Sequence, residues 1–86
     1  MNIEKEQTLP DWFDGIVYEE GDIVTNNYSG NSCWLNANEL SMYDFIKGCE
    51  FLLENSIGNE ALTNSFYAGL WWFKDNSIDK YMILLD

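Results

Sequence analysis

Between residues 42 and 53, apolar side chains recur at the spacing of one helix face, and this pattern constrains the fold more than any other. Side chains at positions i, i+3, i+4 and i+7 of an α-helix lie on the same side. The segment is therefore expected to form an amphipathic helix, and the rest of the chain must bury its apolar residues against it. The stripe consists of Met42, Phe45, Ile46, Cys49, Leu52 and Leu53.

The beginning of this helix has competing candidate caps. Ser41 and Asp44 have the spacing of a capping box, with Asp in place of the usual Glu or Gln. A start nearer Asn36 or Asn38 is the alternative, because Glu39 stands three residues after Asn36. The sequence leaves both starts open.

Two further helical segments are expected toward the C-terminus. Residues 55–58 interrupt the first helix, and apolar residues then return every three or four positions over residues 59–74. Periodicity does not distinguish a helix from a strand over residues 81–85. Ser77 as an N-cap, with Asp79 in the first turn, favours a short helix, and a strand that completes the sheet is the alternative.

Short segments rich in branched and aromatic residues precede the helices. They cover residues 16–18, 21–25 and 32–35 and are separated by turn-forming residues. This pattern predicts an antiparallel meander, which is too small to be stable without a helical cover. The predicted fold class is α+β, with a small antiparallel β-meander covered by two α-helices.

The chain has 86 residues, enough for one domain and not for two. Its 47% apolar and 16% aromatic content favours a folded chain over a disordered one. We expect a flexible N-terminal tail over residues 1–9 and one compact domain over residues 10–86. The predicted core consists of Ile16, Ile23, Leu35, Phe45, Ile46, Cys49, Leu52, Leu62, Phe66, Leu70 and Phe73.

The charge balance excludes some classes of partner. Fifteen Asp and Glu stand against four Lys, with no Arg or His, for a formal net charge of -11. Nucleic acid and anionic membranes are bound through basic side chains, so neither is an expected partner. A basic protein is favoured as partner, and the alternative is that the charge only keeps the protein soluble.

Catalytic and cofactor motifs are missing from the sequence. It has no His for proton transfer near neutral pH, and no Gly-rich phosphate loop, nucleophile elbow or metal-ligand spacing. We therefore expect a protein that is not an enzyme and has no cofactor. Cys33 and Cys49 are expected to be reduced thiols, because no signal peptide is apparent. The apolar stretches are far shorter than the roughly 20 residues that a membrane helix needs. We therefore expect a soluble, cytoplasmic protein.

Acidic residues are concentrated in the first quarter of the chain. Such a cluster can attract a basic protein surface, and in a narrower form of this hypothesis it mimics the charge of DNA. It can also hold a divalent cation or supply a carboxylate acid/base pair, although its spacing fits no calcium loop. A solvated acidic face without a function is the plainer alternative. The cluster consists of Asp11, Asp14, Glu19, Glu20 and Asp22.

The aromatic residues exceed what one small core can bury. Tyr43 and Phe51 lie off the main stripe of the first helix, and Tyr67 and Trp71 lie one turn apart on the second. Together with Trp12, which is flanked by acids, they resemble interface anchors. The alternatives are a helix buried on two sides or self-association into a homo-oligomer. Residues 26–31 read as a turn, and binding at their aromatic residue is a secondary alternative.

Three phrases and the C-terminus of the chain resemble small acidic proteins encoded by marine T4-like bacteriophages. The three phrases are GIVYEEGDIVTN at 15–26, ELSMYDFIKG at 39–48 and WF at 72–73, and the C-terminus is YMILLD at 81–86. The resemblance covers most of the chain and brings no functional residues with it. It implies a phage product that acts in the bacterial host cytoplasm and makes inhibition of a host protein a natural hypothesis.

These observations favour a non-enzymatic interaction protein, a modulator or inhibitor of a basic host protein. One alternative is a structural or assembly protein that forms a homo-oligomer or joins a virion-associated complex. The other alternative is a carboxylate-based metal-binding protein or hydrolase, which would use the acidic cluster.

Overall fold

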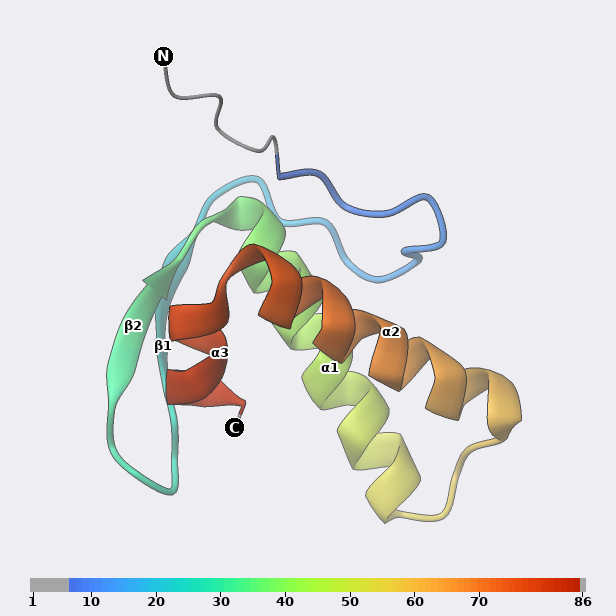
Figure 1. The fold of residues 1–86 in the computed structure, drawn as a ribbon. Coiled ribbons are helices and arrows are strands. Elements are labelled where there is room, and N and C mark those ends of the chain that lie inside the picture. The colour runs from blue at the N-terminus through green and yellow to red at the C-terminus, as the bar shows by residue number, and fades with distance from the viewer. Residues whose placement is uncertain (1–6, 86) are drawn as a thin grey trace.

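The computed structural model describes residues 7–85 and shows a β-hairpin followed by three helices (Figure 1). This arrangement confirms the predicted α+β fold class. The elements in chain order are β1 (Asp22–Thr25), β2 (Ser32–Leu35), α1 (Ala37–Glu54), α2 (Glu60–Asn76) and α3 (Ile78–Leu84).

Helix α1 begins at the earlier of its candidate caps. The Asn36 side chain accepts a hydrogen bond from the backbone N–H of Glu39, and the Glu39 carboxylate accepts one from the backbone N–H of Asn36, each at 2.9 Å. This reciprocal pair is a capping box. Ser41 therefore lies inside the helix, where its hydroxyl donates to the Ala37 carbonyl at 2.7 Å.

Helix α2 runs back along α1 and is capped by Asn59, whose side chain accepts from the N–H of Leu62 at 2.9 Å. It extends two residues beyond the expected end. The C-terminal segment is helix α3, as its acidic first turn indicated. Ser77 holds the N-cap position of α3, but its hydroxyl makes no capping bond and donates to Glu39 instead.

The sheet has two strands, so the predicted meander is wrong in its first strand. Residues 16–18 form no strand, and the N–H of Tyr18 donates to the Ser41 hydroxyl at 2.8 Å. Strand pairing depends on contacts between distant parts of the chain, and here α1 takes the backbone group that a neighbouring strand would use. β1 and β2 pair antiparallel, with Ile23 opposite Trp34.

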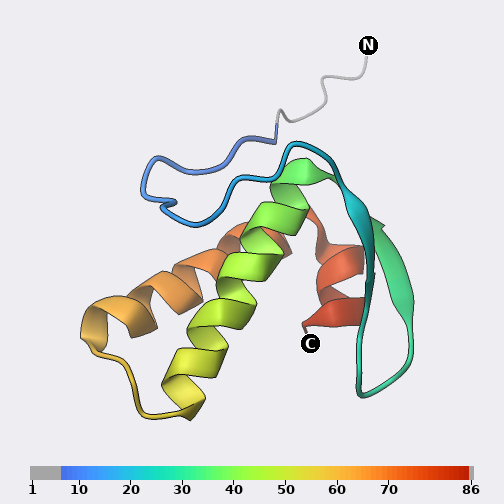
Figure 2. The same ribbon diagram turned by 180° about the vertical axis from the view of Figure 1, so that it is seen from behind.

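The hairpin covers one side of the helical part of the protein (Figures 1 and 2). Alternation along the strands turns Val24, Cys33 and Leu35 toward the helices, and α3 and α1 pack on β2. Ile23 and Trp34 lie on the outer face.

The buried core lies where β2, α1, α2 and α3 meet. Leu35, Ile46, Cys49 and Phe73 are buried as predicted. Met42 and Leu84 also belong to the core, although the predicted set omits them. Phe45, Phe66 and Leu70 pack against this core as partly buried residues, and Leu52 and Leu62 are also partly buried.

Two predicted core residues are exposed instead. Ile16 is 64% exposed and Ile23 is 65% exposed. Ile16 belongs to the segment that forms no strand, and Ile23 lies on the face of the hairpin that no helix covers. Both predictions failed because they depended on the register and number of the strands.

The expected tail lies partly outside the described residues. Residues 7–9 are held against the domain: the Asn38 side chain donates to the Gln7 carbonyl at 2.8 Å, and the Trp72 indole N–H donates to the Thr8 carbonyl at 2.9 Å. Leu9 packs against the core.

Candidate protein-binding surface

An apolar groove of about 440 Å³ lies between the loop at residues 15–16, helix α1 and the beginning of α2. Phe51 on α1 is 63% exposed at this groove, and Ile16, which also lines it, is exposed to nearly the same degree. Single exposed apolar residues are common on protein surfaces, but apolar residues that line one groove form a patch that can mark an interaction site. The apolar lining consists of Ile16, Phe45, Gly48, Phe51, Leu52 and Leu62.

Local packing explains why one wall of the groove is firm. The rings of Trp12 and Phe13 lie 5.9 Å and 5.3 Å from the ring of Phe45, at tilted angles that aromatic pairs favour. The N–H of Phe13 donates to the Pro10 carbonyl at 3.0 Å, which closes the turn that carries both rings. The loop is thus fixed on α1 by its aromatic side chains.

Gly48 leaves the middle of the groove open. A Cβ atom at this position would meet no atom within 4 Å, so the packing of the domain does not require a glycine here. Glycine inside a helix lowers stability by about 0.5–1 kcal/mol relative to alanine. The absence of a side chain allows another molecule to approach the backbone of α1 closely.

Part of the predicted acidic cluster lies beside this groove. Asp14 immediately precedes Gly15 in its rim, and Asp11 precedes Trp12. Asp44, an acid outside the predicted cluster, lines the groove itself. All three carboxylates are exposed. Burial of the Cys49 thiol raises its pKa, and the negative charge of Asp14 raises it further, so this thiol is not activated.

The other members of the cluster lie in the hairpin region. Glu19 and Glu20 are exposed in the bend before β1, and Asp22 begins the strand, where its side chain accepts from the N–H of Ile23 at 2.7 Å. Within residues 7–85, no group of three or more Asp, Glu, Cys or His side chains converges in a way that could hold a metal ion. The cluster is therefore divided between two parts of the surface.

The aromatic residues predicted on α2 form a separate recess. Tyr67 and Trp71 line a space of about 240 Å³ together with Tyr81 of α3. The Lys74 ammonium lies 5.9 Å from the centre of the Trp71 ring and 5.7 Å from that of Tyr81. These distances fit cation–π contacts, so the protein's own lysine occupies this recess.

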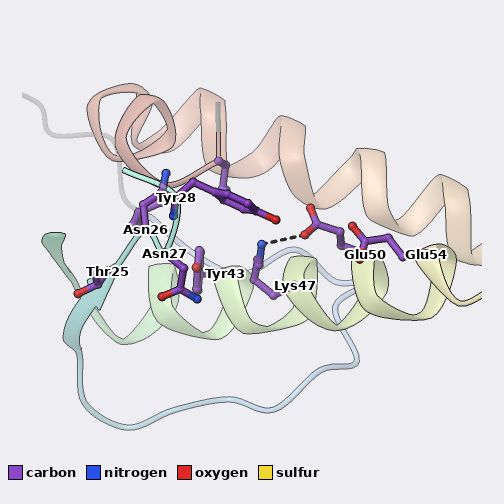
Figure 3. A pocket seen from close by; sticks show the side chains of 10 residues that line it. Thr25, Asn26, Asn27, Tyr28, Tyr43, Lys47, Glu50 and Glu54 are labelled. Carbon is purple, nitrogen blue, oxygen red and sulfur yellow. Dashed lines mark hydrogen bonds and ion pairs between the residues drawn. The ribbon is translucent and has the colours of Figure 1, made fainter. Parts of the chain in front are cut away.

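Tyr43, the remaining predicted aromatic, lines a polar pocket of about 260 Å³ between the hairpin loop and α1. Figure 3 shows Tyr43, Lys47, Glu50 and Glu54 in order along the helix, with residues of the hairpin loop beside the first of them. The Lys47 ammonium donates to Glu50 Oε1 at 2.8 Å.

Lys47 and Tyr43, two titratable groups of this pocket, keep their ordinary charge states at neutral pH. The hydrogen bond to Glu50 raises the pKa of Lys47 in spite of partial burial, and burial raises the pKa of the Tyr43 phenol. Sequence reasoning missed Lys47, Glu50 and Glu54. Their spacing with Tyr43, at i, i+4, i+7 and i+11, is the signal that could have indicated a shared polar stripe.

A buried carboxylate joins the ends of two helices on another side of the protein. Glu39 is 3% exposed, and it accepts hydrogen bonds from Lys80 at 2.7 Å, from the Ser77 hydroxyl and from the Gln7 side chain. Burial raises its pKa, but the bonds from Lys80, Ser77, the Asn36 backbone and Gln7 together lower it below the ordinary value. Glu39 links the beginning of α1 to that of α3, and it also lines a recess of about 340 Å³ together with Asn76, Asp79 and Lys80.

No family model, curated protein or solved structure matches the chain. No helix in the part of the chain that the structure describes is long and apolar enough to cross a membrane.

Proposed function

We propose that this protein is a non-enzymatic interaction protein that docks a basic protein through its acid-flanked apolar groove. The observation that carries the proposal is the exposed pair Ile16 and Phe51, which line one groove together with Asp44. Asp14 immediately precedes Gly15 in the rim of this groove. Such a patch, apolar at its centre and charged at its edge, has the composition of a protein interface.

Charge complementarity determines which partner fits. With a net charge of -11, the protein attracts basic surfaces over long distances and repels acidic ones. The occupant of the groove is therefore a segment with one or two apolar side chains flanked by Lys or Arg. The apolar side chains fill the groove, and the basic ones approach Asp14 and Asp44.

The sequence resemblance to proteins of marine T4-like bacteriophages supports a biological form of this proposal. In that form the protein is a phage-encoded modulator or inhibitor of a basic protein of the bacterial host. If the partner binds DNA and duplex DNA displaces it from this protein, the modulator acts by DNA mimicry.

The proposal is tested by capture from a bacterial lysate, followed by calorimetry with the purified partner. We expect the substitution Phe51→Gln to weaken binding by about 1–2 kcal/mol, or roughly 5- to 30-fold, because it removes the exposed ring without shortening the side chain much. Met82→Gln is the matched control, since Met82 is an exposed apolar residue outside the groove. Equal effects of the two substitutions would remove the groove from the proposal.

Self-assembly is a second candidate function, favoured by the outer face of the hairpin. Ile23 and Trp34 lie opposite each other there and are 65% and 55% exposed, and within residues 7–85 β1 pairs with no strand other than β2. The second edge of β1 is therefore open, and an open strand edge pairs readily with another chain. Light scattering at rising protein concentration tests this candidate: a dimer that Ile23→Thr returns to monomer supports it, and a monomer throughout excludes it.

A further inference from the structure

We propose that the pocket between the hairpin loop and α1 binds the guanidinium group of an arginine side chain from a basic protein. The proposal deepens the proposed function, on which it rests for the source of the arginine. The pocket lies on the stripe of α1 that carries Tyr43, Lys47, Glu50 and Glu54, whereas the groove uses the stripe with Phe45, Gly48 and Leu52.

The size of the pocket suits one side chain. Its volume of about 260 Å³ is below the range of about 300–1,000 Å³ that is typical of sites for cofactors and other small molecules. The lining is mainly polar and comes from the hairpin, α1 and the C-terminal end of α3.

The charges of the pocket favour a cation. Glu50 neutralises Lys47 through an ion pair at 2.8 Å that uses only one of its carboxylate oxygens. No hydrogen bond or ion pair joins the Glu54 carboxylate to another residue of the described chain. The pocket therefore keeps one uncompensated carboxylate and a second carboxylate with a free oxygen, and the net charge of the whole protein disfavours an anion.

Tyr28 supplies a further element of recognition. Its side chain is 99% exposed, so the ring has almost no packing of its own, although it lines the pocket. The backbone around it is ordered: Asn26 Oδ1 accepts from the N–H of Tyr28 at 2.8 Å, and the Asn26 side-chain amide donates to the Ile83 carbonyl at 2.9 Å. The ordered backbone places this ring beside the pocket, where an aromatic ring can stack on a bound cation.

These features select arginine over lysine. A guanidinium has five N–H donors in one plane, which can reach both carboxylates while one face stacks on Tyr28. An ammonium is a compact, strongly hydrated charge that satisfies fewer of these acceptors at once. Asn27, whose side chain also lines the pocket, offers a further acceptor.

The test is an NMR titration of the ¹⁵N-labelled protein with N-acetyl-arginine amide. We expect saturable shifts at the amides of Asn27, Tyr28, Glu50 and Glu54. N-acetyl-citrulline amide, the neutral analogue of the same shape, should give no saturable shifts. Equal binding of the citrulline analogue would overturn the proposal, and equal binding of N-acetyl-lysine amide would overturn the assignment to a guanidinium.

Two substitutions test whether the arginine probe binds in this pocket. Glu54→Gln should weaken binding of the arginine probe at least about fivefold, because it removes a charged acceptor. Since Glu54 lies at the C-terminal end of α1, loss of its negative charge does not harm the helix. Glu60→Gln, which removes the same charge outside the pocket, should leave the affinity unchanged. Equal losses for both variants would mean attraction to the overall charge and overturn the pocket.

The titration is independent of any partner protein. If the probe binds as expected while no basic partner is retained, the pocket stands and the proposed function fails. If a partner is retained through the groove while the arginine probe gives no saturable shifts, the proposed function stands and the arginine pocket fails.

Discussion

Glu39 links protonation to stability at the scale of a single residue. Its pKa is lowered from an ordinary value of 4.5, because four hydrogen bonds to the carboxylate together outweigh its burial. A carboxyl group whose pKa is lower in the native protein than in the unfolded chain contributes its full stabilisation when the pH is above the pKa of the unfolded chain. That contribution is lost as the pH falls through the native value.

We therefore expect Glu39→Gln to lower the free energy of unfolding at pH 7 by about 1–3 kcal/mol, since it leaves Lys80 without its partner. The difference from the wild type should shrink as the pH falls below 4.5. Urea unfolding between pH 3 and 7 measures this, with Glu19→Gln as an exposed control outside the helices that should change stability by less than about 0.5 kcal/mol. A difference that does not depend on pH would contradict the role assigned to the carboxylate.

The backbone of Ser56, another single residue that affects stability, is strained. It has a φ of 59° in the turn after α1, a left-handed conformation that costs residues with a Cβ roughly 1–2 kcal/mol. Ser56→Gly should raise the free energy of unfolding by about 1 kcal/mol, whereas Ser65→Gly inside α2 should lower it by about 0.5–1 kcal/mol. Chemical denaturation compares the two, and a loss of stability in both would contradict the strain.

Among the helices and strands, α1 supplies most of the groove. A substitution at Gly48 should change the stability of this helix and the binding of a partner in opposite directions. Gly48→Ala should stabilise the free protein by about 0.5–1 kcal/mol, because the new methyl group meets no atom within 4 Å. The same methyl group projects into the groove and should weaken binding of the partner. A variant that is more stable and binds equally well would show that close approach at Gly48 is not used.

The elements also show what a sequence can predict. Helix periodicity is local, so the apolar stripe predicted α1 and the Asn36–Glu39 spacing contained its cap. The strand expected at residues 16–18 failed because pairing is decided by distant groups, here the Ser41 hydroxyl. The polar pocket was missed for the same reason, since it is assembled from the hairpin, α1 and α3.

The candidate surface was predictable only in part. The surplus of aromatic residues correctly indicated exposure of Phe51, Tyr67 and Trp71. Tyr43, predicted with them, is instead half-buried and packs against the core. Their distribution over separate recesses could not be predicted, because it depends on how α2 packs against α1 and α3. Ile16, a predicted core residue, became part of the groove when its strand did not form.

The net charge of -11 acts at the scale of the whole molecule. Repulsion among exposed carboxylates destabilises the compact state, and salt screens it. We expect the thermal unfolding midpoint to rise by a few degrees from low salt to about 0.5 M NaCl, since roughly 1 kcal/mol corresponds to about 4–8 °C in a domain of this size. The double substitution of Glu19 and Glu20 to Gln should reduce this rise. A midpoint that falls with salt would contradict net repulsion.

The central claim is that a basic protein docks on the acid-flanked groove, and binding of the purified partner at two salt concentrations tests it most directly. The account predicts that wild-type protein binds at low salt and loses most of its affinity at about 0.5 M NaCl, where exposed charges are screened beyond a few ångströms. It also predicts that Phe51→Gln weakens binding at low salt while Met82→Gln does not. Affinity that is indifferent to both salt and Phe51→Gln would contradict the claim.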